Sequence, residues 1–539
     1  MSKAYWLALF IAFDLFAPAR AGTSNLAQRW IYYSSNLLVD KNIDDLEGVF
    51  QRAAKAGYNG VALSDSKFGR LDEMDQHYFR NIERVKKIAA ENKLQIVPAV
   101  FPIGYSEGLL AHDPNLAEGL PVHDSLFVVK NGVARAVAEP GVEFKGADFH
   151  NLSQWAFHDE TVVPEHGAVR VVAPQARNAR IMQRLKLHAF RQYHISVEVK
   201  TEEFSGTPEV KVLNQKGQAL NYADLGVKHT QDWALCNLVF NSLENEEVNI
   251  YFGCWDGKTG TLWWRNPRIE ETALVNLLRR DGAPLEVKLE TGKILVEGKD
   301  FEKLFDPRMG TVPWKGGYEA WHEPPVIHSS LPEGTRLRVS FYHATTFNDG
   351  QVMICPSEPK TVQLLQDQAR RMHALWGAKG YFMSHDEIRV LNWDKSCENR
   401  HMDAGGILSD NVKTCCKILR EVNPGGDIYV WSDMFDPNHN AHANYYLVNG
   451  DLKGSWLGLD KEVIIVPWAI GKRVESLKWF AGLGNRMLIA GYYDAQPERI
   501  EQWLDASKQV NGVIGVMYTT WRHQYGDLEI FEKRVDGYR

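Results

Sequence analysis

Residues 30–102 alternate between two spacings of apolar positions. Three apolar runs, at 30–36, 58–65 and 94–102, have the length and composition of buried strands. Between them, 44–57 and 78–92 place apolar residues three and four positions apart, and the first of these two segments ends at a glycine, as helices do. Strands that alternate with helices of this length predict βαβ units and a parallel sheet.

The same alternation returns in the C-terminal part of the chain. Helical spacing covers 358–380, 473–484 and 497–510. Strand-like runs lie at 337–347, 381–388, 427–435, 462–470, 486–494 and 512–521. Together with the first three runs, these six give nine candidates for a barrel of eight strands, and we assign the surplus to 337–343 or to the edge of the preceding segment. The pattern predicts an α/β fold, a (β/α)8 TIM-type barrel. The alternative, an open doubly wound sheet, lacks a G-x-G-x-x-G after its first strand.

Residues 124–330 interrupt this alternation. Short strand-like runs, for example 194–201, 233–241 and 247–255, follow one another with turn residues between them and almost no helical spacing. Such a series predicts an all-β sandwich of the jelly-roll type, entered from the loop after the third barrel strand. The predicted organisation is a signal peptide at 1–21, the first part of the catalytic barrel at 22–123, the inserted sandwich at 124–330 and the remainder of the barrel at 331–539.

The first residues have the parts of an export signal. Lys3 supplies a positive charge, residues 4–13 are mostly apolar, and Ala19-Arg20-Ala21 matches the small-residue pattern before a cleavage site. The apolar run is too short to span a bilayer, and no later segment approaches the required length. We therefore expect a secreted or periplasmic protein without a membrane span, and its oligomeric state stays open.

The net charge and the aromatic content of the chain indicate which classes of ligand it binds. A net charge of −7 gives no basic surface that would suggest a nucleic acid or an anionic membrane. The chain has 17 Trp and 20 Tyr, and such aromatic residues either fill large cores or form flat surfaces that suit sugar rings. We expect an oligosaccharide or polysaccharide as the ligand and no cofactor.

The cysteines and histidines do not form a recognisable metal motif. No pair of cysteines has the C-x-x-C spacing of a zinc site. Cys236 and Cys254 lie in neighbouring strand-like runs and could pair, and most of the six cysteines are expected to be isolated buried thiols. A metal-dependent barrel hydrolase would use histidines such as His343, His373 and His385, but no His-x-His pair ends the first strand. We predict no catalytic metal.

Acidic and aromatic residues recur at the expected C-terminal ends of the barrel strands, where (β/α)8 enzymes carry their catalytic groups. In chain order these ends carry Asn36, Asp65, Tyr105, Glu107, His385, Asp386, Glu387, Trp431, Asp433, Trp468, Tyr492, Tyr493, Asp494, Trp521, Arg522 and His523. Acids beside Trp at so many strand ends predict a polar cleft with aromatic walls.

Carboxyl groups beside Trp are the chemistry of glycoside hydrolysis, in which a carboxylic acid protonates the leaving oxygen. Asp386 and Glu387 are adjacent, however, and successive side chains of a strand point to opposite sides. Both can flank one bond only if the chain bends there. The later strand ends provide Asp433 and Asp494 but no Glu. This set suits one acid and one orienting carboxylate, with the substrate's own 2-acetamido oxygen as the nucleophile.

Several segments resemble, in order, the family 20 glycoside hydrolases, which are β-N-acetylhexosaminidases, and their relatives. "LSDSKF" stands where that family has an Asp motif after strand two, "IVPAVFPIGYS" is similar to its third-strand segment, and "YFMSHDE" is similar to its H-x-G-G-D-E. The third-strand segment lacks the family's Glu-x-Asp and His, and the two glycines before the acid pair are absent. Family 123, which also uses an Asp-Glu pair, is a similar match.

The resemblance implies an activity and the roles of the acid pair. It implies a retaining hydrolase of β-linked N-acetylhexosamine glycans, with Glu387 as general acid/base and Asp386 orienting the acetamido group. It further implies that Tyr492 hydrogen-bonds the acetamido oxygen.

The predicted substrate-binding set combines the resemblance with the strand-end positions. The resemblance places three Trp residues around the sugar and two Asp residues on its hydroxyls, and the strand ends add further polar residues. The full set is Tyr492, Asp494, Trp431, Asp433, Trp468, Trp521, His385, Asp65 and Asn36.

The end of the middle segment resembles another class of module. "TGTLWWRNPRIEET" (259–272) is similar to the last strand of carbohydrate-binding modules of families 4, 9 and 22. Trp155, Trp233, Trp263 and Trp264 either present sugar platforms or pack between the sheets.

Two alternatives to the substrate-assisted hydrolase stay open. One is an ordinary two-carboxylate glycosidase acting on neutral polysaccharide, with Glu387 as acid and Asp433 or Asp494 as its partner. The other is a non-catalytic glycan-binding protein that keeps the barrel and the sandwich.

Overall fold

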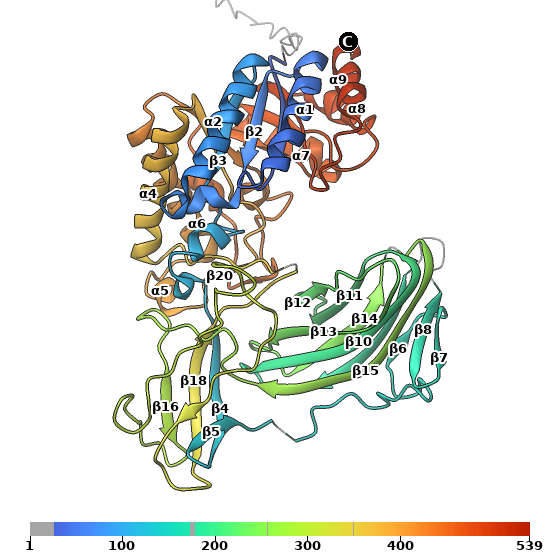
Figure 1. The fold of residues 1–539 in the computed structure, drawn as a ribbon, viewed down its shortest axis with the longest axis vertical. Helices are drawn as coiled ribbons and strands as arrows, with labels where there is room; N and C mark the ends of the chain where they lie inside the picture. The colour runs from blue at the N-terminus through green and yellow to red at the C-terminus, as the bar shows by residue number, and fades with distance from the viewer. Residues whose placement is uncertain (1–25, 139, 173–177, 256, 349, 539) are drawn as a thin grey trace, which may run out of the picture.

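The computed structural model describes residues 26–138, 140–172, 178–255, 257–348 and 350–538. The predicted signal peptide lies outside these residues. Eight parallel strands close into a barrel in the order β1-β2-β3-β19-β21-β23-β24-β25 (Figure 1). Their bounds are β1 (Gln28–Ser34), β2 (Gly60–Ser64), β3 (Gln95–Val100), β19 (Gly380–Met383), β21 (Asp427–Trp431), β23 (Ile464–Val466), β24 (Met487–Ala490) and β25 (Val513–Tyr518).

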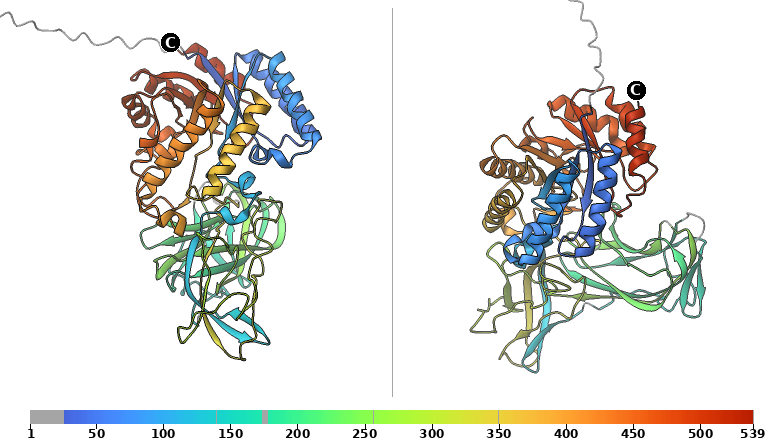
Figure 2. Two further views of the ribbon diagram at one scale, coloured as in Figure 1. Left: turned by 90° about the vertical axis from the view of Figure 1, so that its left-hand side faces the viewer. Right: turned by 45° about the horizontal axis from the view of Figure 1, so that its top comes forward.

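Helices surround the barrel at one end of the molecule, and the antiparallel sheets lie at the other end (Figure 2). In chain order the helices are α1 (Asp40–Ala56), α2 (Gln76–Glu91), α3 (Glu107–Leu110), α4 (Pro359–Trp376), α5 (Lys395–Glu398), α6 (Ala404–Val422), α7 (Arg473–Leu483), α8 (Arg499–Ser507) and α9 (Leu528–Gly537). The helix α6 has no counterpart among the helices named from the sequence. Its first turn contains Gly405 and Gly406, which weaken the helical pattern.

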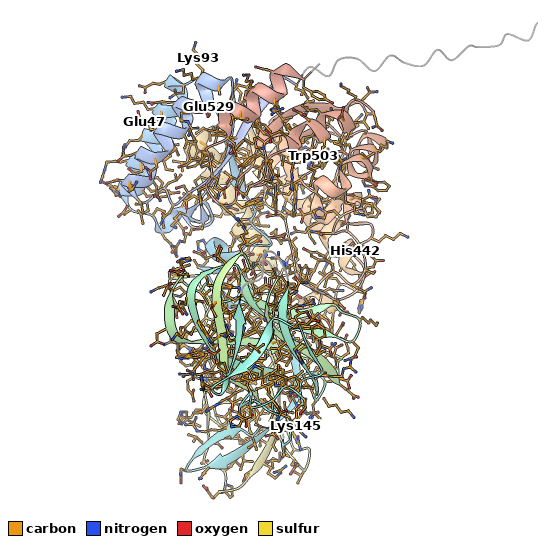
Figure 3. The ribbon with its side chains drawn as sticks, turned by 90° about the vertical axis from the view of Figure 1, so that its right-hand side faces the viewer. Glu47, Lys93, Lys145, His442, Trp503 and Glu529 are labelled. Atoms are coloured by element: carbon orange, nitrogen blue, oxygen red, sulfur yellow. The ribbon has the colours of Figure 1, made fainter. Side chains whose placement is uncertain are left out.

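Helix α1 shows how the sequence determines these elements. Ile43, Leu46 and Phe50 are fully buried and recur three or four residues apart, which gives the helix one apolar face. Gly57 ends the helix with a φ of 111°, a conformation that favours glycine. Arg52 of α1 forms an ion pair of 2.7 Å with Glu529 of α9, which links the first and last helices of the barrel. Figure 3 labels Glu47 of α1 and Glu529 of α9 on these two helices.

Aromatic side chains fill the interior of the barrel. The rings of Phe382 and Tyr429 are stacked with centroids 6.3 Å apart, and Phe382 meets Trp431 edge-on at 4.8 Å. Trp30 and Met517 are buried in the same cluster. The barrel is therefore a packed core, and any site must lie at one of its ends.

Two five-stranded antiparallel sheets form a sandwich, and both lie between β3 and β19 along the chain. Phe252 of one sheet contacts Trp264 of the other at 5.8 Å between ring centroids. The first sheet contains β13 (Gln231–Asn241), β10 (Gln192–Ser205), β15 (Thr259–Thr272), β8 (Ala168–Val172) and β7 (Val162–Glu165). The second contains β12 (Ala219–Asp224), β11 (Pro208–Asn214), β14 (Glu247–Cys254), β9 (Ala179–Lys186) and β6 (Phe157–His158).

A third antiparallel sheet lies beside the sandwich. It contains β16 (Glu286–Leu289), β18 (Arg336–His343), β4 (Leu120–Lys130), β5 (Val133–Ala136) and β17 (Ile327–His328). The surplus strand candidate at 337–343 is thus β18, which pairs with β4 and β16 and not with the barrel. The predicted boundary between 330 and 331 crosses this sheet.

Two further expectations need correction. The predicted strand at 381–388 ends at Met383, because the polar residues that follow form a loop before the short pair β20 (Val390–Leu391) and β22 (Leu447–Val448). Cys236 and Cys254 lie in β13 and β14, which belong to different sheets, and they are thiols and not a disulfide. Within the described residues, we find no helix that combines the length and apolar character needed to cross a membrane.

Candidate functional site

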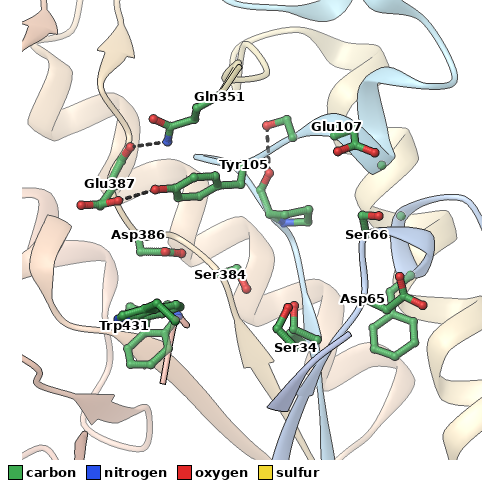
Figure 4. Close-up of a pocket in the computed structure, with 18 of the residues that line it drawn as sticks. Ser34, Asp65, Ser66, Tyr105, Glu107, Gln351, Ser384, Asp386, Glu387 and Trp431 are labelled. Atoms are coloured by element: carbon green, nitrogen blue, oxygen red, sulfur yellow. Dashed lines mark hydrogen bonds between the residues drawn. The ribbon is translucent and has the colours of Figure 1, made fainter. Parts of the chain in front are cut away.

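A cavity of about 590 Å³ opens at the C-terminal ends of the barrel strands (Figure 4). Each of the eight strands, or the segment directly after it, contributes to the lining. These contributions include Tyr32 and Ser34 for β1, Ser64 for β2, Val100 for β3, Asp386 for β19, Trp431 for β21, Trp468 for β23, Tyr493 for β24 and Trp521 for β25. The cavity therefore lies where this architecture carries its chemistry.

Two loops cover one side of this cavity. The loop after β3 contributes Tyr105 and Glu107, and the segment after β18 contributes Asn348 and Gln351. The first loop also touches the acid pair, because a Cβ atom at Gly104 would lie 2.0 Å from the backbone oxygen of Asp386. The glycine thus permits a close approach that another residue would prevent.

The chain bends at Glu387, so both acids of the pair face the cavity. After β19 the residues alternate in direction: Ser384 and Asp386 line the cavity, whereas His385 is fully buried on the other side. Glu387 would follow His385 in a continuing strand, but its φ of 48° turns the chain and brings its side chain back to the cavity. Both acids can flank one bond only if the chain bends at the pair, and this bend is present.

Glu387 is held by contacts on its carboxylate and on its backbone. Tyr105 donates a hydrogen bond to Oε2, and Nη2 of Arg389 lies 2.8 Å from Oε1 (Figure 4). The backbone N–H donates to Oδ2 of Asp433 at 2.9 Å, and Nε2 of Gln351 donates to the backbone oxygen at 3.0 Å. These partners fix the strained backbone and the position of the carboxylate.

The carboxyl groups of the site are electrostatically coupled. Burial raises the pKa of Asp386 well above its ordinary value, and the charges of Asp433 and Glu387 raise it further. Burial also raises the pKa of Asp433 to about 6, although the backbone N–H of Glu387 opposes this shift. Burial and mutual repulsion therefore favour the protonated forms of Asp386 and Asp433.

Aromatic rings form a continuous wall beside the acid pair. Trp468 stacks on Tyr493 with centroids 5.5 Å apart, and Tyr493 meets Trp521 at 6.2 Å. Trp521 lies 5.6 Å from Trp431, which in turn lies 5.6 Å from Tyr32. The exposed faces of such rings suit the apolar face of a sugar.

The structure brings together six of the predicted site residues and separates the other five. The residues that line the cavity are Asp386, Glu387, Trp431, Trp468, Trp521 and Asp65. The predicted residues that do not line it are Tyr492, Asp494, Asp433, His385 and Asn36.

Tyr492 and Asp494 flank Tyr493, whose side chain lines the cavity. Tyr492 is buried, stacks on Tyr518 at 4.0 Å and donates a hydrogen bond to Asp527. Its neighbour Tyr493 faces the cavity instead, because successive side chains point to opposite sides. Asp494 accepts hydrogen bonds from the Thr520 hydroxyl and from the backbone of Trp521, so it positions that ring.

Two other predicted residues, Asp433 and His385, do not line the cavity but contact the segments that form it. Asp433 is fully buried, and besides the Glu387 backbone it accepts from Nδ2 of Asn440 and Nε1 of Trp468. His385 contacts Asn411 of α6 at 3.1 Å, and burial lowers its pKa to about 4. Both residues hold the loops that carry the acid pair.

Asp65 and Asn36 are engaged in local structure. Asp65 borders the cavity, but its carboxylate accepts hydrogen bonds from Tyr78 and from the backbone of Leu37 and Lys67. Asn36 lines a neighbouring hollow, which shares His523 with the cavity, and its Oδ1 accepts from the backbone of Leu38.

The three histidines considered for a metal do not come together. His343 contacts Asn241, His373 contacts Tyr381, and His385 contacts Asn411. The one group of potential metal ligands found among the described residues contains no histidine.

The predicted set lacks several residues that form the site, among them Tyr32, Tyr105, Gln351, Arg389 and Tyr493. Tyr105 and Tyr493 were recognised at strand ends, and the alternation of side chains could have favoured Tyr493 over Tyr492. Arg389 lies two residues after Glu387, a spacing that carries no signal outside regular structure. Gln351 reaches the site from a distant segment, and nothing in the sequence indicates this contact.

The sandwich Trp residues are largely engaged in packing. Trp155 and Trp264 are buried, and their ring centroids lie 6.1 and 5.8 Å from that of Phe252. Trp263 donates to Glu165, and the guanidinium of Arg265 lies 4.0 Å from the ring centroid of Trp233. The sandwich also touches the site's surroundings, because Tyr222 of β12 contacts Phe347 at 5.3 Å and Tyr446 at 6.3 Å.

No protein-family model and no curated protein matches the sequence. One similar solved structure is a β-N-acetylhexosaminidase, with 10% identity and a TM-score of 0.26, matched over 35% of this chain and 45% of that chain. Another is a family 4 carbohydrate-binding module, with 16% identity and a TM-score of 0.19, matched over 24% of this chain and 85% of that chain. A family 16 module has 14% identity and a TM-score of 0.20, over 23% and 96%. These are partial likenesses of fold, and no activity transfers from them to this chain.

Proposed function

We propose that the protein is a glycoside hydrolase whose active site is the cavity at the barrel mouth. The observation that carries the proposal is the pair Asp386–Glu387, which faces an aromatic-walled cavity in spite of its adjacency. The raised pKa of Asp386 favours its protonated form, and the wall from Trp468 to Tyr32 supplies flat apolar surface. Acid, carboxylate and aromatic faces are what cleavage of a glycosidic bond requires.

The reaction proposed is retaining and substrate-assisted. Glu387, which lies on the open side, donates a proton to the leaving oxygen while the acetamido oxygen of the substrate attacks the anomeric carbon. Asp386 orients the acetamido group and stabilises the positive charge that develops on it. Glu387 then accepts a proton from the water that opens the cyclic intermediate. The substrates would be β-linked N-acetylhexosamine glycans.

A second allocation of roles is favoured by one feature of the electrostatics. Arg389 lies 2.8 Å from Glu387 and forms an ion pair with it, whereas the raised pKa of Asp386 favours the protonated form of that carboxyl. In this allocation Asp386 is the acid, Glu387 faces the anomeric carbon as a carboxylate, and no acetamido group is needed. Asp433 and Asp494 are poor partners for Glu387 in an ordinary pair, because neither lines the cavity.

A panel of aryl glycosides tests the proposed reaction. We expect hydrolysis of aryl N-acetyl-β-hexosaminides, inhibition by the N-acetylglucosamine thiazoline that mimics the cyclic intermediate, and no comparable hydrolysis of aryl glucosides or galactosides. Activity on the neutral sugars together with insensitivity to the thiazoline would contradict the acetamido mechanism. Binding of glycans with no turnover on any substrate would support the non-catalytic alternative.

The leaving group distinguishes the two allocations of roles. An acid is needed least when the leaving group is a good one, so loss of the acid spares a dinitrophenyl glycoside more than a methylumbelliferyl one. We expect Glu387→Gln to show this difference and Asp386→Asn to lose both activities equally. The opposite pattern would assign the acid to Asp386.

The place of action is proposed from the N-terminus alone. The leader-like segment at 1–21 supports export to the periplasm or the medium, where glycan polymers are degraded. The N-terminal residue of the mature protein, determined from the native host's extracellular or periplasmic fraction, should be Gly22.

A further inference from the structure

Four potential metal ligands meet at the junction of the barrel and the antiparallel sheets: Glu118, Cys355, Asp394 and Cys397. Each offers one ligand atom, and these atoms all lie within 4.8 Å of one another. The four residues are between 0 and 2% exposed, and none lines the cavity at the barrel mouth. Figure 1 shows α5, which begins directly after Asp394 and contains Cys397, at this junction.

The spacing of the ligand atoms is that of a tetrahedral zinc site. Zinc bonds of about 2.3 Å to sulfur and about 2.0–2.1 Å to oxygen place two sulfurs about 3.8 Å apart, and a sulfur and an oxygen about 3.6 Å apart. The sulfurs of Cys355 and Cys397 are 3.7 Å apart. Cys355 Sγ lies 3.6 Å from Asp394 Oδ1, and Cys397 Sγ lies 3.5 Å from Glu118 Oε2. Three edges of the tetrahedron thus have the required length.

The surrounding groups direct one oxygen of each carboxylate toward the sulfurs. Oε1 of Glu118 accepts a hydrogen bond of 2.8 Å from the backbone of Trp393, which leaves Oε2 facing Cys397. Oδ2 of Asp394 accepts one of 2.6 Å from Nη2 of Arg280, and Oδ1, which accepts one of 3.1 Å from the backbone N–H of Cys397, faces Cys355. Such outer partners are what orients the ligands of a metal site.

The negative charges of the cluster also favour a bound cation. Glu118 and Asp394 are two acids in a closed, fully buried space. Arg280 is the nearby cation, but it is shared between Asp394 and Glu358, at 2.6 Å and 2.5 Å. Buried like charges that lack compensation are costly, and a divalent ion would neutralise two of the four negative charges that two carboxylates and two thiolates carry.

We propose that Glu118, Cys355, Asp394 and Cys397 bind one structural zinc ion. Two thiolates select zinc over magnesium or calcium, which prefer oxygen ligands. The four ligands fill the tetrahedron, and a site without an open position is structural and not catalytic.

The ion would join the two segments that connect the barrel with the sheets. The outgoing segment carries Glu118 and the returning one carries Cys355, and the two already pair through the backbone, Glu118 N to Met353 O at 2.9 Å and Cys355 N to Leu116 O at 2.8 Å. The returning segment also carries Gln351, whose side chain contacts the backbone of Glu387. The ion thereby fixes the base of a loop that lines the cavity.

The competing possibility is a disulfide between Cys355 and Cys397. A disulfide requires sulfurs about 2.05 Å apart and is common in exported proteins. It would leave Arg280 as the nearby cation for Glu118 and Asp394.

Metal content and thiol state of the full-length protein decide between these possibilities. We expect one zinc per chain by mass spectrometry of the metal after gel filtration without added metal, and an intact mass that shows both cysteines reduced. A metal-free protein, or a mass lower by two hydrogens with Cys355 and Cys397 linked in peptide maps, would overturn the proposal.

Variants then locate the ion. Protein produced with Co²⁺ should show a thiolate-to-cobalt charge-transfer band, which Cys355→Ala and Cys397→Ala should abolish. Cys416→Ala, which removes a buried thiol outside the cluster, should keep the band. If the ligand variants do not fold, Glu118→Gln, which preserves side-chain size, should still bind cobalt with an altered spectrum. An unchanged spectrum in all these variants would place any metal elsewhere and overturn the assignment.

Discussion

Two clusters of carboxyl groups in this protein differ in what surrounds them. At the barrel mouth, Asp386 and Glu387 face a cavity of about 590 Å³. At the junction of the barrel and the sheets, Glu118 and Asp394 face two thiols and no cavity, and they are 2% and 0% exposed. Both clusters concentrate negative charge in a medium that solvates it poorly.

The difference lies in how each cluster is neutralised. The open cluster contains Asp386, whose raised pKa favours protonation, and pairs Glu387 with Arg389, so its charge can change while a substrate reacts. The closed cluster has ligand atoms at fixed tetrahedral spacing, which suits a permanent ion. A cluster open to a cavity suits chemistry, and a closed one suits structural support.

The largest expected effect is on turnover at the open cluster. Glu387→Gln removes the proposed acid while preserving its size, so kcat should fall by roughly 10³-fold or more, with the Tm and the metal content unchanged. The measurement is hydrolysis of an aryl N-acetyl-β-hexosaminide with a poor leaving group. Glu475→Gln, at an exposed position of α7, is the matched control and should retain full activity. Equal turnover in the two variants would remove Glu387 from the reaction.

The next effect is on stability at the closed cluster. Cys397→Ala should lose the ion and destabilise the fold by about 4 kcal/mol or more, measured by denaturant unfolding. Cys416→Ala should cost much less, because it removes only a buried sulfur. Strong loss of kcat in the Cys397 variant, measured where it is still folded and with its Tm unchanged, would reverse the roles of the two clusters.

A smaller effect is a pH dependence of stability from the open cluster. The pKa of Asp386 is raised in the folded state, so the folded protein binds more protons than the unfolded chain above pH ~3.9. The stabilisation of the folded state by this shift is fully present below that pH. It is lost as the pH rises, by up to about 1.4 kcal/mol per pH unit. Asp386→Asn should remove this slope, so the variant gains stability relative to the parent protein as the pH increases. A difference in Tm that does not vary with pH would contradict the shift.

The smallest effect concerns the aromatic wall. Trp521 is 39% exposed and lines the cavity, so Trp521→Ala should weaken substrate binding by about 1–1.5 kcal/mol and raise KM roughly tenfold, with little change in Tm. Trp314, which is 53% exposed and outside the cavity lining, is the control. A similar KM for both variants would show that the wall does not hold the sugar.

The spacing of apolar residues was sufficient to predict the barrel strands and the sandwich, because burial on regular elements leaves a periodic trace. The rule that barrel enzymes carry chemistry at strand ends then identified Asp386, Glu387 and three Trp residues of the cavity. The rule does not give the directions of side chains in the loops that follow the strands. It named both Tyr492 and Tyr493, and only the alternation of side chains could have favoured Tyr493. It also could not tell that Asp433 does not line the cavity.

The closed cluster could not be predicted from the sequence alone. Asp394 and Cys397 are close in the chain, but Glu118 lies 276 positions before Asp394. No local motif links residues from three separate loops, and only the closure of the barrel brings those loops together. Cys355 and Cys397, expected to be isolated thiols, are neighbours for that reason.

The central claim is that the open cluster acts on a sugar bound at the barrel mouth. Its most direct test is a crystal structure of the protein with N-acetylglucosamine thiazoline. The account predicts the sugar ring against Trp431, with Asp386 in hydrogen-bonding distance of the thiazoline nitrogen and Glu387 within about 3.5 Å of the anomeric centre. A thiazoline bound only in the sandwich or in the hollow beside Asn36, with the barrel mouth empty, would contradict it.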